Sequence, residues 1–547
     1  MKKLVALFLA CMLLCTTAAF VAAEEPMIIK VLDVTTQHTE EIENNVTTRF
    51  IEEKFNVKFE WEHISQSVAA EKFNIYVQGD SLPDLIMLPE TYMDVAGAFS
   101  LGVEGVLRDL TDLIAEYGPN ITKNMEADAA YASAATAPDG AIYNIPVNTF
   151  GRGQEVVTHL FINTEWLKAL NMEMPKTIDE FYAYLKGVKE NDVNGNGDPN
   201  DEIPLMQRGS AATYMAAHST IMGAFTPTQT KSDFMLDENN QVYFQPTADG
   251  YREGLSFLAK CYAEGLLYTE AYSITRDGIW QIADTSPDYD MIGAIPGHNG
   301  SCMFSNATNR FVNYEIVPKL SSANFEGNYI YDPYYSLKVG GVIPTSCSDE
   351  VAVKLMQIFD YFASEEGTLM QFRGPEGYYW EYAEEGELNA KGEQAVYRTF
   401  SDEEMIAKYG EDSEQWMDEA KVAFGWGWPA YQTEHYTNAV AQPVTEFTAH
   451  SQKFTSDYMV EVYGEELIGG ERVFPSIFAF SEDALYDISL WKTDIDSYVS
   501  QSEAEFIMGK RDVNNDAEWQ AYVDHLNGLG LNDYLAVVQA EWAAAQK

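Results

Sequence analysis

The feature that most constrains the fold is the order of apolar segments in the first ninety residues. Residues 27–34 are an almost continuous apolar run, which predicts a buried strand. Apolar residues at helical spacing lead to Phe55, residues 57–61 alternate as in a strand, a helix is expected near 68–77, and residues 84–88 predict a third strand. This order predicts a parallel sheet with right-handed crossovers.

Ligands of such sheets bind outside the carboxyl ends of the strands. We therefore expect Glu90 and Tyr92, which follow the third strand, to border a binding site. Residues 139–147 predict a turn followed by a strand that ends in Pro, and further strands are predicted at 160–162, 291–295 and 314–318. Residues 337–343 form an apolar segment closed by Pro344, and the chain past Gly374 is expected to be mostly helical. The fold class is therefore α/β.

Length and charge limit the domain number and the partners. A chain of 547 residues is too long for one core, so two or more lobes are expected. Lys and Arg total 34 against 85 Asp and Glu, a formal net charge of −51. Such a surface repels phosphate backbones and anionic lipid heads, so nucleic acid is not an expected partner.

Residues 1–23 have the pattern of a secretory signal, with cleavage after Ala23. We expect an extracytoplasmic protein with no membrane span in the mature chain, because no later apolar run reaches about 18 residues. A lipid anchor stays open, since Cys11 and Cys15 match a lipobox only loosely. The mature chain keeps three cysteines, Cys261, Cys302 and Cys347, and an odd count excludes complete internal pairing.

The segment 192–202 carries oxygen-bearing side chains at every second position as far as Asn200, followed by two carboxylates. Gly195 and Gly197 allow sharp bends, so the loop can direct several oxygens at one point. Hard oxygen ligands favour calcium over zinc. The start resembles an EF-hand loop, but its twelfth position is Ile203. The alternative is an ordinary Asn/Gly/Pro turn that binds no ion.

Several segments resemble family-1 extracellular solute-binding proteins of carbohydrate ABC importers, particularly the large type that includes alginate-binding proteins. The segments are 80–86 (DSLPDLI), 139–146 (DGAIYNIP), 161–167 (FINTEWL), 174–181 (MPKTIDEF), 201–204 (DEIP), 361–367 (YFASEEG) and 506–512 (FIMGKRD). They follow the family's order over nearly the whole mature chain.

The resemblance implies a periplasmic-binding-protein-like fold, in which two α/β lobes joined by crossing hinge strands enclose a ligand cleft. On this basis we assign 24–147 and 336–375 to the first lobe, 148–335 to the second, and 376–547 chiefly to the second. It also implies a structural calcium ion. Its ligands would be the side chains of Asp192, Asn194 and Asn196, the carbonyl of Asp198, and the carboxylates of Asp201 and Glu202.

A sugar site needs aromatic rings that cover the sugar faces and polar groups that bind the hydroxyls. We expect these side chains in loops, where core packing is a weaker explanation for them. The candidates besides Glu90 are Phe150, Arg152, Trp280, Tyr334, Tyr335, Trp380, Trp426 and Trp428. Any one aromatic is more often part of a core than of a site.

The sequence therefore favours a monomeric, non-catalytic binder that closes on an oligosaccharide and delivers it to ABC-transporter permease subunits. Two alternatives remain. A secreted glycoside hydrolase would need two facing carboxylates, which sequence alone cannot place. A binder of peptides or other small solutes would use the same scaffold.

Overall fold

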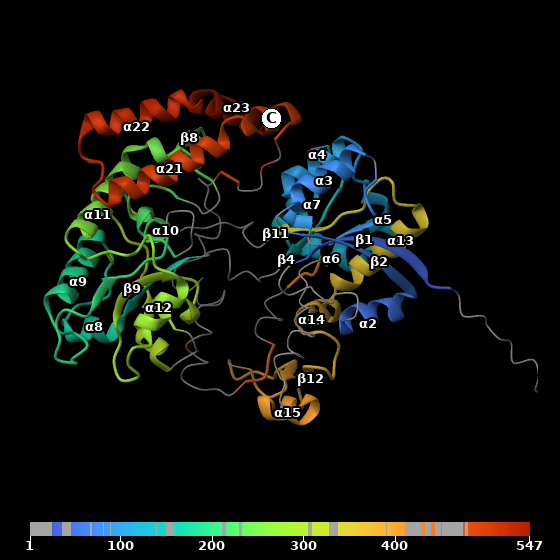
Figure 1. The fold of residues 1–547 in the computed structure, drawn as a ribbon, viewed down its shortest axis with the longest axis horizontal. Helices are drawn as coiled ribbons and strands as arrows, with labels where there is room; N and C mark the ends of the chain where they lie inside the picture. Colours follow the sequence, from blue (N-terminus) through green and yellow to red (C-terminus); the bar gives the residue numbers. More distant parts are fainter. Residues whose placement is uncertain are drawn as a thin grey trace, which may run out of the picture.

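The computed structural model describes most of the mature chain. The described residues are 25–35, 45–65, 68–79, 81–87, 89–137, 139–148, 158–209, 215–228, 232–304, 309–327, 337–389, 391–410, 428–432, 439–442, 450, 474–475, 478 and 480–546. The predicted signal at 1–23 lies outside them. Two groups of helices and strands are visible, one built mainly from the blue N-terminal third and one from the green middle with the red C-terminal helices (Figure 1).

The first lobe begins with the predicted parallel sheet. Strand β1 (Met27–Thr35) lies between β2 (Val57–Ser65) and β3 (Leu85–Ile86), and both pairings are parallel. The crossover helices are α2 (Val46–Phe55), capped by the Asn45 side chain, and α3 (Ala69–Gln78). The alternation of buried residues along β2 confirms the strand that the sequence predicts.

Short helices and one more strand complete the N-terminal part of this lobe. They are η3 (Pro89–Thr91), α4 (Val95–Val103), α5 (Thr111–Tyr117), α6 (Pro119–Ala127), α7 (Ala129–Ala135) and β4 (Ile145–Asn148).

The chain returns to the first lobe after residue 336. Strand β11 (Leu337–Gly341) pairs with β4 in antiparallel register, and α13 (Asp349–Phe362) and α14 (Glu365–Arg373) follow. One buried cluster joins both parts, since Ile29, Val31 and Leu85 of the first sheet pack with Leu355 and Phe359 of α13. The first lobe is thus made from two stretches that are far apart in sequence.

Three stretches of chain lie side by side where β4 and β11 pair. The Asn148 N–H donates to the Ala430 carbonyl at 2.9 Å, and the Gln432 N–H donates to the Asn148 carbonyl at 3.0 Å. The β11 register shifts at Gly340, where an added Cβ would lie 2.7 Å from the Ile145 carbonyl oxygen and 2.8 Å from the Val147 nitrogen. Only glycine fits between these backbones.

The second lobe contains a four-stranded sheet in the order β10-β5-β9-β6. Its strands are β5 (His159–Asn163), β6 (Ile203–Leu205), β9 (Ile292–Gly297) and β10 (Tyr314–Ile316). Strand β6 is parallel to β9, and β5 is antiparallel to both β9 and β10. Strands β6, β9 and β10 therefore end at the same edge, which is also where β5 begins.

Helices and a hairpin surround this sheet. They are α8 (Thr164–Ala169), α9 (Ile178–Glu190), α10 (His218–Ile221), η5 (Met222–Ala224), β7 (Phe234–Leu236), β8 (Val242–Phe244), η6 (Gln245–Thr247), α11 (Asp249–Ala263), α12 (Arg276–Ala283), η7 (Gly300–Cys302) and η8 (Asn309–Asn313).

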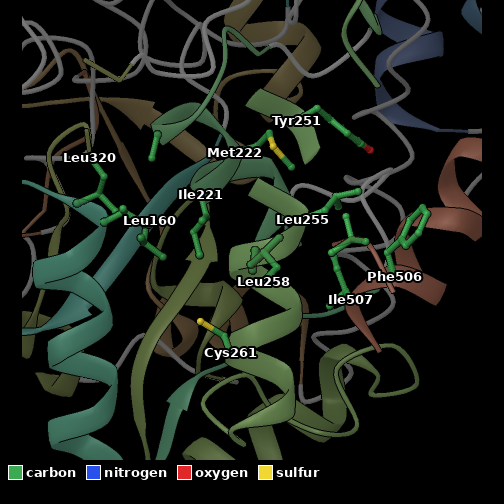
Figure 2. Close-up of a cluster of buried hydrophobic side chains, with 14 of the residues drawn as sticks. Leu160, Ile221, Met222, Tyr251, Leu255, Leu258, Cys261, Leu320, Phe506 and Ile507 are labelled. Atoms are coloured by element: carbon green, nitrogen blue, oxygen red, sulfur yellow. The ribbon is translucent and has the colours of Figure 1, made fainter. Parts of the chain in front are cut away.

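The C-terminal helices pack onto the second lobe (Figure 1). They are α20 (Glu482–Ser489), α21 (Lys492–Ile507), α22 (Asp516–Gly528) and α23 (Leu531–Ala545). Leu255 and Leu258 of α11 face Phe506 and Ile507 of α21 in one buried cluster (Figure 2). The second lobe is therefore also built from separate stretches of sequence.

The segment after α14 differs from the prediction of mostly helix past Gly374. Strands β12 (Trp380–Tyr382) and β13 (Tyr397–Thr399) form an antiparallel pair, and α15 (Asp402–Tyr409) follows. Trp380 and Tyr397 pack with Leu369 of α14, which attaches this segment to the end of the first lobe. Aromatic residues, which fit a pleated surface, stabilise strands here where helix was expected.

The three cysteines of the mature chain, Cys261, Cys302 and Cys347, are free and buried. In the described part of the chain, no helix combines the length and apolar character that crossing a membrane requires.

Candidate functional site

The loop 192–202 lies between helix α9 and strand β6. Helix α9 begins with a capping box in which the Thr177 hydroxyl accepts from the Glu180 N–H and the Glu180 carboxylate accepts from the Thr177 N–H, as its sequence predicts. Strand β6 starts one residue after the loop. Gly195 and Gly197 have φ values of 72° and 95°, which glycine adopts without strain.

Side chains of the loop converge on Asp201. The Asn194 Nδ2 donates to Asp201 Oδ1 at 3.2 Å, and the Asn196 Nδ2 donates to Asp201 Oδ2 at 2.7 Å. The Oδ1 atoms of the same two asparagines accept the backbone N–H two residues further on, at 3.0 and 2.8 Å. These bonds fold the backbone around the side chains and hold the amide groups near one carboxylate.

Two more aspartates bond to the loop backbone. Asp192 Oδ2 accepts from the Gly197 N–H at 2.9 Å, which closes the first turn. Asp198 Oδ1 accepts from the N–H and the amide of Asn200 at 3.1 and 3.2 Å. The Asp198 side chain is therefore engaged within its own turn, and only its carbonyl was predicted as a ligand.

Glu202 is the buried end of the loop, with 6% of its surface exposed. Its Oε1 accepts from the Val193 N–H at 2.9 Å, while its Oε2 is buried and has no hydrogen-bond partner. Burial raises the pKa of this carboxyl, and the charge of Asp201 raises it further. A buried carboxylate oxygen without a partner is costly unless a cation compensates it.

The donor set fits a hard cation. Within the described ranges, no three Asp, Glu, His or Cys side chains gather as a metal site. The loop instead offers a mixture of carboxylate, amide and backbone oxygens. Oxygen-only donors of this kind are typical of calcium ligands and not of zinc.

Only some of the predicted ligand-binding residues lie in the described part of the chain. Phe150, Arg152, Tyr334, Tyr335 and Trp426 lie outside the described residues. Glu90 lies in η3, but its side chain is not described.

Trp380 and Trp428 pack in buried clusters. Trp380 is 3% exposed, and its indole N–H donates to the Gly374 carbonyl at 2.7 Å. Trp428 is 6% exposed and stacks on Phe362, with ring centroids 4.7 Å apart and 11° between the planes. These contacts are those of core residues, so the ligand role of both tryptophans stays a prediction that the packing does not favour.

Trp280 is only partly buried. Its indole N–H donates to the Ser301 carbonyl at 2.9 Å, and the Arg276 guanidinium lies 4.7 Å from its ring centroid. Arg276 is not among the residues predicted from the sequence. The spacing of four residues, which places two side chains on one face of a helix, was the available signal.

A second polar group lies at the carboxyl edge of the first lobe's sheet. Asp33, at the end of β1, is buried and lies 3.1 Å from His63 Nδ1, near the end of β2. The hydroxyl of Tyr92 is buried without a hydrogen-bond partner, and burial raises the pKa of this phenol. Polar side chains thus follow the sheet at the edge where the sequence predicts a ligand.

Comparison with known proteins gives consistent matches. Residues 35–271 match the family model of bacterial extracellular solute-binding proteins. The fructooligosaccharide ABC transporter substrate-binding protein FusA of Streptococcus pneumoniae serotype 4 is 24% identical over 504 residues, covering 89% of this chain and 85% of FusA.

Solved structures have the same fold. FusA of S. pneumoniae with kestose has a TM-score of 0.70 at 22% identity, and its EF-hand mutant with fructo-nystose has 0.67 at 21%. Each match covers 95% of this chain and 99% of the FusA chain. The alginate-binding protein AlgQ2 without calcium ion has a TM-score of 0.64 at 20% identity, covering 95% of this chain and 98% of AlgQ2. The likeness establishes the periplasmic-binding-protein-like α/β fold.

Proposed function

We propose that this chain is an extracellular solute-binding protein, which captures an oligosaccharide outside the cytoplasm and delivers it to an ABC importer; the match of residues 35–271 to the model of that bacterial family supports this. The observation that carries this proposal is the similarity to FusA along nearly the whole length of both chains. Family and relatives are solute-binding proteins and not enzymes, and we propose that this chain likewise catalyses no reaction.

Hinge closure is the mechanism that we propose. Strands β4 and β11 pair with each other beside residues 430–432, and we propose that the hinge lies next to this pair. A ligand that contacts both lobes stabilises the closed form over the open one, and the permease subunits then distinguish the two.

Calcium at the loop 192–202 is the second part of the proposal. Relatives support it, because FusA has been solved as an EF-hand mutant and AlgQ2 without calcium ion. The ion would be held by the side chains of Asp192, Asn194 and Asn196, the Asp198 carbonyl, and the carboxylates of Asp201 and Glu202. A bound cation would neutralise the buried Glu202 carboxylate and fix the end of α9 to the start of β6.

The remaining predictions concern the cell surface. We propose export by the signal at 1–23, with a lipid anchor as the open alternative. The mature chain acts as a monomer in this proposal, and permease subunits are its protein partners.

Binding and hydrolysis are separated by one set of measurements. The mature chain, with calcium present, is titrated calorimetrically with kestose, lacto-N-tetraose, a trimannuronate and a mixed peptide pool, and the sugars are analysed by mass spectrometry afterwards. Binding of a sugar that is recovered intact supports the proposal. Released sugar fragments would indicate a glycoside hydrolase. Binding of peptides alone would indicate a binder of peptides on the same scaffold.

A further inference from the structure

Three side chains lie together at the carboxyl edge of the second lobe's sheet, and only one of them, Trp280, is predicted from the sequence. Strands β6, β9 and β10 end there, and β5 begins there opposite Gly297. Helix α12 and the short helix η7, which follows β9, bring together Arg276, Trp280 and Ser301. Ligands of open α/β sheets bind outside this kind of edge.

Ser301 fixes the other two side chains. Its carbonyl accepts from the Trp280 indole at 2.9 Å and from Arg276 Nη2 at 3.2 Å, and its hydroxyl lies 3.1 Å from the same Nη2. Asn299 holds Ser301 in turn, because its Oδ1 accepts from the Ser301 N–H and hydroxyl at 3.0 and 2.8 Å. The indole and the guanidinium are therefore oriented before any ligand arrives.

Among the described residues, no carboxylate neutralises the Arg276 guanidinium. Five other arginines each lie within 4.0 Å of one, namely Arg108, Arg252, Arg310, Arg398 and Arg511. Arg276 has no such neighbour in the described residues, although the chain carries a net charge of −51. Its Nε is buried without an acceptor, and its Nη1 makes no hydrogen bond within the described ranges.

We propose that Arg276, Trp280 and Ser301 form one wall of the saccharide site, with Arg276 as a specificity-determining residue. The inference rests on the proposed function. The indole packs against the C–H face of a sugar ring, and the guanidinium donates from Nη1 to two neighbouring sugar oxygens. A pair of hydroxyl groups or the carboxylate of a uronic acid supplies such oxygens, and the experiment separates these two sources.

The test compares variants on the sugars that the wild-type chain binds. Kestose represents the neutral sugars and a trigalacturonate the acidic ones, both titrated calorimetrically at 50 and 300 mM salt. Arg276→Gln should weaken binding at least tenfold, and Trp280→Ala should do so as well. Loss confined to trigalacturonate, with strong salt dependence, assigns the carboxylate. Equal loss on kestose, with weak salt dependence, assigns the hydroxyl pair.

Arg252 provides the matched control. Its guanidinium also lies over an indole, 5.5 Å from the Trp519 ring, but on α11 and bonded to Asp516. Arg252→Gln should leave the affinity within twofold of wild type. If Arg276→Gln melts more than a few degrees below wild type, Arg276→Lys, which keeps the charge but loses the planar fork, replaces it and should weaken binding at least threefold.

Two results would overturn the inference. In the first, both Arg276 variants bind a sugar as tightly as the wild-type chain does. Arg276 would then not belong to the saccharide site, and the proposed function would be unaffected. Failure of the wild-type chain to bind either sugar or any other member of the panel contradicts the proposed function itself, and the inference falls with it.

Discussion

The Tyr251 hydroxyl donates a hydrogen bond of 3.1 Å to Glu503 Oε2, which joins α11 to α21 across 252 positions of sequence. The same carboxylate oxygen lies 3.2 Å from His218 Nδ1 on α10. Glu503 is 2% exposed, so this polar group lies among the apolar side chains that attach the C-terminal helices to the second lobe. The hydrogen bond to Tyr251 therefore helps to hold α21 against the second lobe.

The first prediction concerns acid stability. Burial lowers the pKa of His218 from 6.5 to about 4, so the folded chain holds this imidazole neutral where the unfolded chain protonates it. Above pH 6.5 both states hold His218 neutral, and its titration does not affect stability. As the pH falls from 6.5 towards 4, the unfolded chain is protonated first, and the free energy of unfolding decreases by up to about 3 kcal/mol. Urea unfolding at several pH values should show a shallower acid loss in His218→Asn than in wild type.

Burial also lowers the pKa of His159, to about 3, but this residue is present in both proteins and its effect cancels in the comparison. Parallel pH profiles for wild type and His218→Asn would contradict the assignment to His218.

The second prediction concerns calcium. A ligand that binds only the folded chain raises its stability by about 2.7 kcal/mol at a hundredfold excess over Kd. Calcium should therefore raise the melting temperature, chelator should lower it, and Asp192→Ala should abolish both responses. Glu190→Gln is the control, because this exposed residue at the end of α9 pairs with Lys186 and lies outside the loop. A chelator-insensitive wild type would count against a removable ion.

The third prediction concerns the corner between α13 and α14. A Cβ added to Gly367 would lie 1.9 Å from the Tyr361 carbonyl oxygen and 2.5 Å from its carbon. Backbone atoms cannot move aside as a side chain can, so Gly367→Ala should cost about 3 kcal/mol or more in urea unfolding. Gly528→Ala, in α22 with nothing within 4 Å of the added carbon, should instead be neutral or stabilise by up to about 1 kcal/mol. Equal stability of the two variants would refute the steric argument.

The fourth prediction separates a core tryptophan from a site tryptophan. Trp428 packs on Phe362, Phe359 and Phe59, so Trp428→Ala should lose about 3–5 kcal/mol of unfolding free energy. Trp280 is partly exposed, and Trp280→Ala should lose less than about 1 kcal/mol while weakening sugar binding. Chemical denaturation of both variants checks the contrast, and a stable Trp428→Ala protein would return that residue to the list of ligand candidates.

Many helices and strands could be predicted from the sequence, because the residue patterns that specify them are local. The parallel order of β1, β2 and β3 follows from a strand–helix alternation, and the capping box of α9 follows from Thr177 and Glu180. The pair β12–β13 could not be predicted in this way. Its strands are three residues long and are stabilised by packing on α14, which no sequence period reveals.

The candidate site shows the same division. The loop 192–202 could be recognised because its donors are contiguous, and the structure does bring Asn194, Asn196 and Asp201 together. A sugar site is assembled from distant loops, so composition alone could not tell Trp280 from the buried Trp428. Arg276 could not be predicted, because only the fold shows that no described carboxylate lies next to its guanidinium.

The discontinuous first lobe has a consequence for export. Its buried cluster needs both β1, near the start of the mature chain, and α13, more than three hundred residues later. If the chain is exported from its N-terminus as proposed, the first lobe cannot form until α13 has crossed the membrane. The apolar strands near the N-terminus would therefore stay unpacked during most of translocation. We expect secretion yield to depend on the chaperones that meet the emerging chain, even for variants whose final stability is unchanged.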